Sequence, residues 1–405
     1  MRSIFFCLFL LIGFSGCQKK VTQEELLPDY LKALLPEWDK AGASVDMDDF
    51  LRVKAYPSTD LDSLINANKE IIVELQAGEY FLDEPLNLKT DVFLKGIHKD
   101  SVFIISTFKR PFHPMPLETP CSIEFWNANN SGLSNLTLIY RAVDFLPHHQ
   151  EYFHEGWDKQ VFKNDPQGDT LLYVGHVGIK NSEQITIDNC NIYNAGTDPI
   201  IIAESSHVSI LDTHVKGSYN KGGKGNGYFN IDANSSYVLL KGNRVEKIRH
   251  LAIQNGAHHN VVVENDLEVD VNFHNGDAGS NLVERNIIRI PEWHGWHCFS
   301  AGAKSLHDPP GSNNYLFNNL TQYKLPIPVI RPIAVEYGDS IIYQSQQIVD
   351  TIMIKDQPQI RYKYGAVDFK RSTLSNRLFV MNDQWNDRKR VQFLEELEVQ
   401  SIYLK

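Results

Sequence analysis

The chain between Val177 and Phe299 alternates short apolar strands with polar turns, and a strand recurs every twenty to thirty residues. Because strand side chains alternate faces with a period of two, every second position points inward and the positions between them should form an exposed row. The inward positions make two series, two residues apart: Ile179, Ile202, Ile231, Ile253, Phe273 and Phe299, preceded by Val177, Ile200, Phe229, Leu251, Val271 and His297.

A second apolar pair follows each of these strands, beginning with Ile185 and Ile187 and then Val208 and Ile210. A repeat this short holds two or three strands and no helix, and one coil cannot bury its apolar face alone. The pattern therefore predicts an all-β solenoid of stacked coils. A recurring amide after the second strand predicts a hydrogen-bonded column along the stack, formed by Asn189, Asn243, Asn265, Asn286 and Asn318.

The upstream segment 71–96 carries the same kind of repeat, with the runs Ile71–Leu82, Leu86–Leu88 and Val92–Gly96. This segment resembles the opening coil of the pectate-lyase-like right-handed parallel β-helix superfamily, and the resemblance covers roughly residues 61–320. It implies a right-handed parallel β-helix in a carbohydrate-active protein. It leaves the reaction open, since the superfamily includes lyases, glycoside hydrolases, epimerases and non-catalytic adhesins.

The N-terminus combines a basic start, an apolar run from Ile4 to Phe14 and the ending Ser15-Gly16-Cys17. Residues 1–16 therefore read as a secretory signal peptide, too short to span a bilayer as a permanent helix. The ending resembles the bacterial lipoprotein signal, which implies a lipid on Cys17 and attachment to the outer membrane. An ordinary signal peptide with an incidental Cys stays the alternative. The basic pair Lys19-Lys20 favours the periplasmic side over the cell surface.

Composition changes along the chain predict three further regions. Residues 17–60 should form a tether and an N-terminal cap, 61–321 the parallel β-helix that carries the catalytic site, and 322–405 a small C-terminal β-rich cap or accessory module. A long insertion between Arg141 and Leu171 is either one wall of a substrate groove or a packed surface loop.

The bulk properties narrow the partner. With 405 residues, 42% of them hydrophobic, the chain can bury a sizeable core. A net charge of −11 argues against nucleic acid, whose binding needs a basic patch. We expect a monomer that binds an anionic poly- or oligosaccharide. Cys121, Cys190 and Cys298 show neither a disulfide nor a metal pattern and should be buried small residues.

The predicted outward rows concentrate polar chemistry on the middle coils. An ordinary solvent face is rich in Lys, Glu, Thr and Ser, whereas this one holds His, Asn, Asp, Gln and Tyr. Adjacent coils lie about 4.8 Å apart, so these side chains should form one patch. The rows are, before the strand, His176, Pro199, Tyr228, His250, Asp270 and Trp296; within it, Gly178, Ile201, Asn230, Ala252, Asn272 and Cys298; and after it, Lys180, Ala203, Asp232, Gln254, His274 and Ser300.

This patch suits β-elimination from a uronic acid, which needs a base, an acid for the leaving oxygen and groups that stabilise the carboxylate. The predicted catalytic residues are His274, His250, Tyr228 and Arg249, with Asp270 orienting His250. Trp rings stack on sugars, so a Trp-rich segment should form a subsite wall. The predicted substrate-binding residues are Asn230, Asp232, Gln254, Asp270, Asn272, Lys224, Trp293, Trp296 and His297. The hypothesis is a carbohydrate lyase that cleaves chains or dehydrates a terminal residue.

Two alternatives remain at this level. A glycoside hydrolase needs two carboxylates about 5 to 9.5 Å apart, which Asp232 and Asp270 would supply, with Asp198 or Asp277 nearby. A non-catalytic glycan-binding lipoprotein needs only the aromatic wall. Calcium stays an open candidate cofactor, because the patch offers Asp and Asn oxygens but no calcium-loop spacing.

Overall fold

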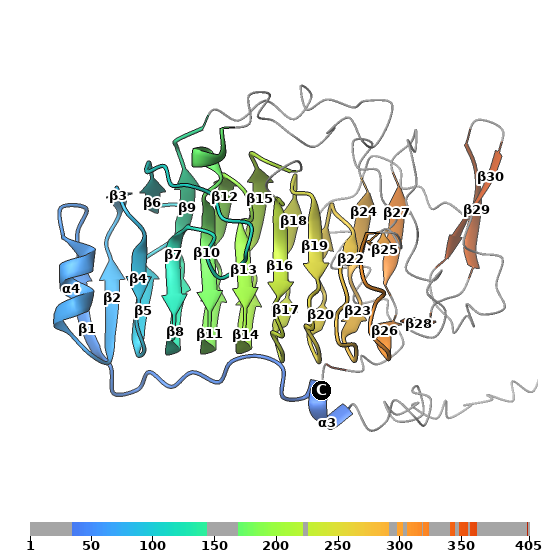
Figure 1. Ribbon diagram of the computed structural model, residues 1–405, viewed down its shortest axis with the longest axis horizontal. Coiled ribbons are helices and arrows are strands. Elements are labelled where there is room, and N and C mark those ends of the chain that lie inside the picture. The colour runs from blue at the N-terminus through green and yellow to red at the C-terminus, as the bar shows by residue number, and fades with distance from the viewer. Residues whose placement is uncertain are drawn as a thin grey trace, which may run out of the picture.

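The computed structural model describes residues 35–143, 169–221, 226–290, 298–302, 306–317, 319–323, 341–344, 348–354, 357–362 and 403. In these residues the chain winds into coils that stack side by side (Figure 1), and each complete coil adds one strand to each of three parallel sheets. The predicted right-handed parallel β-helix is confirmed.

Sheet 1 has eleven strands and runs the whole length of the stack. Its order is β1 (Leu51–Ala55), β2 (Ile71–Leu75), β5 (Val92–Gly96), β8 (Asn129–Ser134), β11 (Glu183–Asp188), β14 (Ser206–Leu211), β17 (Leu239–Lys241), β20 (Val261–Val263), β23 (Leu282–Glu284), β26 (Asn314–Phe317) and β28 (Ile341–Gln344). The parallel ladder thus begins at β1, ahead of the predicted start at residue 61.

Sheet 2 has eight strands and carries the candidate site on its outer face. Its order is β4 (Leu86–Leu88), β7 (Cys121–Trp126), β10 (Gly175–Lys180), β13 (Ile200–Ala203), β16 (Tyr228–Asp232), β19 (His250–Ile253), β22 (Val271–Phe273) and β25 (Phe299–Ala301).

Sheet 3 has nine strands, and it closes each coil. Its order is β3 (Gly78–Leu82), β6 (Val102–Ser106), β9 (Thr137–Tyr140), β12 (Asn191–Ala195), β15 (His214–Ser218), β18 (Arg244–Glu246), β21 (Asp266–Leu267), β24 (Ile287–Ile290) and β27 (Leu320–Tyr323). Outside the stack, β29 (Ile348–Ile354) and β30 (Gln357–Tyr362) form an antiparallel hairpin within the predicted C-terminal module.

The core is a set of apolar columns, one residue per coil. Ile179, Ile202, Ile231, Ile253 and Phe273 pair in register and are fully buried, as predicted. The last coil corrects the prediction: Phe299 pairs with Val271, and Ala301 takes the place beside Phe273. Phe299 thus occupies the inward position assigned to His297, which lies outside the described residues. The three cysteines are buried and no disulfide joins them.

An asparagine ladder runs inside the turn between sheets 1 and 3. Each side-chain oxygen accepts from the backbone N–H of the Asn one coil earlier, at 2.9 to 3.0 Å. The ladder comprises Asn243, Asn265, Asn286 and Asn319, so the predicted Asn318 is one residue off. Asn189 was also misplaced: its N–H pairs with Leu211 in the neighbouring column, and Cys190 and Thr213 continue the ladder instead.

The N-terminal segment contributes a cap and a strap. Helix α4 (Leu61–Ala67) places Leu61 and Ile65 in the core cluster and covers the first coil, at the left end of Figure 1. Between α3 (Leu35–Trp38) and β1 the chain runs back along one edge of the stack. We call residues 38–50 the strap. It bonds to five coils, at Ser280, Tyr237, Ser209, Gln184 and Asn130.

Candidate functional site

The outer face of sheet 2 brings the predicted polar residues onto adjacent strands. Tyr228 on β16 pairs with His250 on β19, and Asn272 on β22 pairs with Ser300 on β25. Ser300 was expected in the row after the strand, but the two-residue register correction places it in line with Asn230 and Asn272. By its backbone alignment Cys298 takes the place predicted for Trp296, next to Asp270, but its side chain belongs to the core cluster.

The expectation of an exposed outer row is wrong for this sheet. His250, Asp270, Asn230 and Asn272 are each 0% exposed, and every described residue of β10, β13, β16 and β19 is buried. A buried polar cluster of this kind is stable only when its members satisfy one another by hydrogen bonds.

His274 is the partly accessible centre of the cluster. Its Nδ1 lies 3.0 Å from Gln254 Oε1, and its Nε2 lies 3.2 Å from the Tyr228 hydroxyl oxygen. Because the Gln254 oxygen can only accept, Nδ1 carries the proton and Nε2 is left to accept from the Tyr228 hydroxyl. Burial lowers the pKa of His274 well below its usual value, and the neighbouring His250, Arg249 and His307 lower that pKa further.

His250 and Asp270 form a second pair, fully buried beside the first. Asp270 Oδ1 lies 2.6 Å from His250 Nδ1, and Asp270 Oδ2 accepts from Asn272 Nδ2 at 3.0 Å and from the Ser300 hydroxyl. The carboxylate therefore fixes the orientation of the imidazole, as predicted from their positions one coil apart. The His250 ring lies 5.1 Å from the Tyr228 ring and 5.9 Å from the His274 ring, centroid to centroid.

Arg249 contributes a positive charge to the cluster. Its guanidinium carbon lies 5.3 Å from the centroid of the Tyr228 ring. Arg249 is only partly buried, so its charge is close both to the Tyr228–His274 pair and to solvent. Sequence reasoning missed His307, whose ring lies 4.4 Å from that of His274. It follows β25 in a segment where the strand repeat gives no signal.

Two buried carboxylates form the other side of the cluster. Asn230 Nδ2 bridges them, at 3.3 Å from Asp198 Oδ2 and 3.1 Å from Asp232 Oδ2. Asp198 Oδ1 also accepts from the Tyr228 backbone N–H at 2.8 Å, and burial raises the pKa of Asp198 to about 7. Gln254 Nε2 donates to Asp232 Oδ2 at 2.9 Å, which links these carboxylates to His274.

The remaining predicted residues separate into two groups. Lys224, Trp293, Trp296 and His297 lie outside the described residues. Asp277 lies elsewhere: its carboxylate holds the backbone N–H groups of Gly279 and Gly311 and the amides of Asn281 and Asn314. Across the described ranges, no three His, Cys, Asp or Glu side chains are arranged to hold a metal ion.

No family model and no curated protein sequence matches this chain. Among solved structures, the chain is similar to an exopolygalacturonase from Thermotoga maritima, with 13% identity over 78% of this chain and 83% of that one and a TM-score of 0.44. It is also similar to a polygalacturonase from Erwinia carotovora, with 13% identity over 75% and 98% of the two chains and a TM-score of 0.43. A surface adhesin of Streptococcus pneumoniae gives 12% identity over 75% and 82%, with a TM-score of 0.40.

The chain is a right-handed parallel β-helix. These similarities carry no conclusion on function, because the identities and TM-scores are low and the three proteins differ in function. Evidence on function comes from the residues on the outer face of sheet 2.

Proposed function

We propose that the protein is a carbohydrate lyase that acts by β-elimination on uronic-acid-containing poly- or oligosaccharides. The observation that carries the proposal is the 3.2 Å contact between the Tyr228 hydroxyl and His274 Nε2, with the Arg249 guanidinium beside it. This arrangement offers a base, an acid and a fixed positive charge at one place, which are the three requirements of the reaction.

His274 is the base of the proposed reaction. Its lowered pKa keeps the ring neutral near pH 7, and the bond from Nδ1 to Gln254 directs the lone pair of Nε2 toward the Tyr228 hydroxyl. When the Tyr228 hydroxyl turns to the leaving oxygen, this lone pair is released, and Nε2 takes the proton on the carbon next to the uronate carboxylate. The electrons left on that carbon form the new C=C bond as the bond to the leaving oxygen breaks.

Tyr228 is the acid. Burial raises the pKa of its hydroxyl to about 12, so the group holds its proton until the leaving oxygen develops negative charge. Tyr228 gives that oxygen its proton. The proton held on His274 then passes to Tyr228 across their hydrogen bond, and this transfer restores both groups for the next cycle.

Arg249 pairs with the uronate carboxylate. The negative charge on this group grows as the neighbouring proton leaves, so a fixed cation stabilises the transition state more than the ground state. Arg249 is partly exposed, and its guanidinium carbon lies 5.3 Å from the centroid of the Tyr228 ring. The His250–Asp270 pair underlies the same ring of Tyr228 and keeps it in position.

Hydrolysis is the second candidate, and the bridged carboxylates favour it. Asp198 and Asp232 share Asn230 Nδ2, so their oxygens are separated by no more than the sum of its two hydrogen bonds. The raised pKa of Asp198 suits a general acid. We propose this pair in place of Asp232 and Asp270, because the shared Asn230 amide holds Asp198 and Asp232 close together.

Product chemistry separates the candidates. The purified protein should be incubated with pectic, alginate, glycosaminoglycan and ulvan-type substrates, and the products followed by ultraviolet absorbance and mass spectrometry. A lyase produces unsaturated ends, whereas a hydrolase produces reducing ends without unsaturation and adds one water per cleavage. Binding of a glycan with no product of either kind would support a non-catalytic binding protein instead.

The location is part of the same proposal. A lipid on Cys17, residues 17–34 as a tether and the strap at the stack would place the site in the periplasm, next to the outer membrane. Within the described residues, no helix has both the length and the apolar character to cross a membrane. The tether and Cys17 lie outside the described residues.

A further inference from the structure

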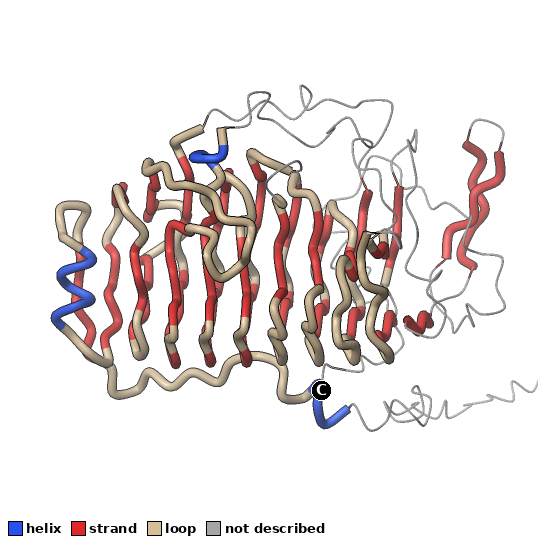
Figure 2. Tube along the Cα trace, viewed as in Figure 1, coloured by secondary structure: helices blue, strands red, loops and turns tan. Residues whose placement is uncertain are grey.

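We propose that the enzyme acts at chain ends, because one segment closes the outer face of sheet 2 on the N-terminal side of the site. The proposal rests on the lyase function proposed above. We call residues 107–120 the wall. In Figure 2 this segment, which connects β6 to β7, crosses in front of β10 and β13.

The wall contacts the sheet directly. Leu117 packs against a buried cluster of Cys121, Ile201 and Ala203, and Ala233 packs against the same cluster. Ile201 and Ala203 are the outward residues of β13 and are completely buried, and Leu117 lies against them, so the wall covers this part of the face. Ala233 follows Asp232 in the chain, and the wall therefore ends where the polar cluster begins.

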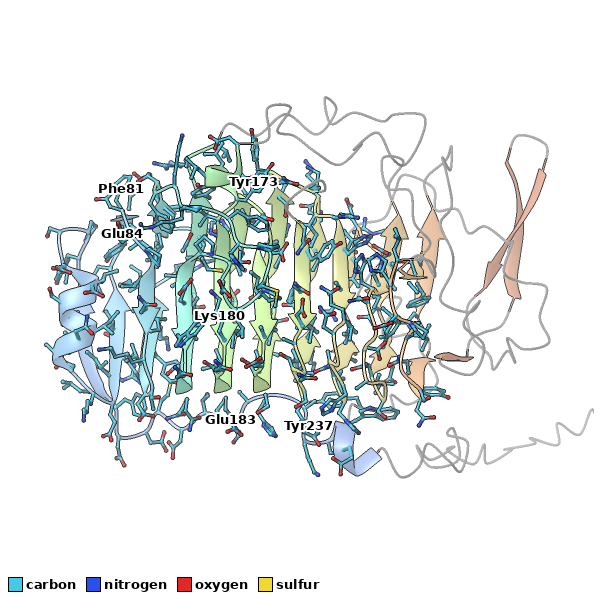
Figure 3. All side chains as sticks on the ribbon, viewed as in Figure 1. Phe81, Glu84, Tyr173, Lys180, Glu183 and Tyr237 are labelled. Atoms are coloured by element: carbon cyan, nitrogen blue, oxygen red, sulfur yellow. The ribbon has the colours of Figure 1, made fainter. Side chains whose placement is uncertain are left out.

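A buried cation fixes the wall to the next strand. Lys180 on β10 is 1% exposed, and its Nζ donates to the backbone oxygen of Thr119 at 2.7 Å and to Glu124 at 3.1 Å. Figure 3 labels Lys180 on the middle of this face. A buried lysine has lost its hydration shell and needs these hydrogen bonds. Displacing the wall would therefore leave the Lys180 ammonium group and the Thr119 carbonyl without this bond.

The N-terminal part of the wall is anchored to Tyr140 of β9 and to Tyr173, which precedes β10. The Tyr140 hydroxyl donates to Phe108 O at 2.9 Å, and the Phe112 ring packs edge-on against Tyr173, with the centroids 5.6 Å apart. Inside the wall, the Thr119 hydroxyl donates to His113 O at 2.8 Å. With anchors along its length, the wall is a fixed part of the fold.

A saccharide that follows the stack from β25 toward β7 therefore meets the wall after β16. The outer positions of β10 and β13, which lie about 4.8 Å apart, offer it no surface. On the N-terminal side, the described residues thus leave a chain no room beyond β16, so the chain enters the site by its end. The product should be one short unit released from that end at each turnover.

The test follows product sizes over time with homogalacturonan and alginate, and with their oligosaccharides from dimer to octamer. We expect the wild-type protein to release one short unsaturated product from the first time point, while the polymer shortens slowly. A ladder of unsaturated products of many lengths would overturn the chain-end proposal and leave the lyase proposal standing. No unsaturated product on any substrate would overturn both.

Two variants test the wall itself. Replacing residues 111–118 by Gly-Ser-Gly, or Leu117→Ser alone, should raise the ratio of long to short early products severalfold. Met115→Ser is the matched control, because Met115 is 57% exposed and lies outside the cluster that Leu117 joins. If all three proteins give the same single product from the chain end, the wall does not set the product length and the proposal fails.

Discussion

At the scale of single residues, His274 is the most sensitive position. Replacing it by Gln removes the base but leaves a polar side chain between Tyr228 and Gln254, so we expect turnover to fall by at least ~100-fold, the scale of general acid–base catalysis. Ala is a poorer choice, since His274 is held among other side chains and its loss would leave a cavity. Initial rates on a confirmed substrate are the measurement.

The matched control is His207→Asn, which changes a histidine at the strap edge of the stack, where His207 stacks on Tyr237. Asn also tolerates the left-handed backbone at this position, where φ is 51°. This control should keep the wild-type rate. Near-wild-type rates for both His274→Gln and His250→Gln would show that the cluster is not the catalytic site.

His176 predicts a pH dependence of stability that is separate from catalysis. It is fully buried, its Nε2 lies 2.7 Å from Tyr193 O, and burial lowers its pKa to about 4. The unfolded chain, with a pKa near 6.5, takes up this proton first as pH falls. The free energy of unfolding therefore decreases between about pH 6.5 and pH 4, by about 3 kcal/mol from this group.

The check is urea unfolding of the wild type and of His176→Gln at pH 8 and pH 4. The variant loses a fixed amount of stability at both pH values but lacks this titration. The gap between the two proteins should therefore narrow on acidification by about 3 kcal/mol. An unchanged gap would show that His176 does not resist protonation in the folded protein.

At the scale of elements, the asparagine ladder stabilises the turn that joins sheets 1 and 3. Asn265 Nδ2 donates to Leu240 O, and its Oδ1 accepts from the backbone N–H of Asn243, both at 2.9 Å. Asn265→Ala leaves these buried groups without partners, so we expect a loss of about 3 kcal/mol in the free energy of unfolding. The exposed Asn66→Ala on α4 should change it by less than about 0.5 kcal/mol.

Register was predictable from the sequence over five coils and failed at the sixth for a physical reason. Alternation with a period of two identifies the inward face but does not distinguish inward positions two residues apart. Phe299 therefore fitted either inward column, and only the pairing of Phe299 with Val271 decides between them. Tyr228, His250, Asp270 and His274 were placed correctly because the strands before β25 hold their register.

The burial of the outer face was not predictable from the strands. It depends on segments such as the wall, whose position is set by long-range contacts of Phe108, Phe112 and Leu117. The pattern within a strand contains no information on what a distant turn will cover. The contact of His307 with His274 was not predicted for the same reason, since His307 lies in a turn.

At the scale of the whole molecule, the proposed lipid anchor predicts where the protein is found. Cys17→Ser removes the residue that would carry the lipid, so we expect the protein to move from the membrane fraction to the soluble periplasmic fraction. The site lies far along the chain from this position, and activity per molecule should be unchanged. Immunoblotting of cell fractions is the measurement, and a variant that still sediments with membranes would contradict the anchor.

The strap also has a consequence for the order of folding. Trp38, which is 1% exposed, donates from its ring to Ser280 O, 242 residues later in the chain, and stacks on Tyr315. Trp38 is therefore synthesised long before its partners, and it becomes buried only when nearly the whole stack has formed. Coils can grow from neighbour to neighbour, but the strap docks only on a finished stack. A chain truncated by early termination would leave Trp38 exposed. Quality-control proteases would then recognise this exposed aromatic residue.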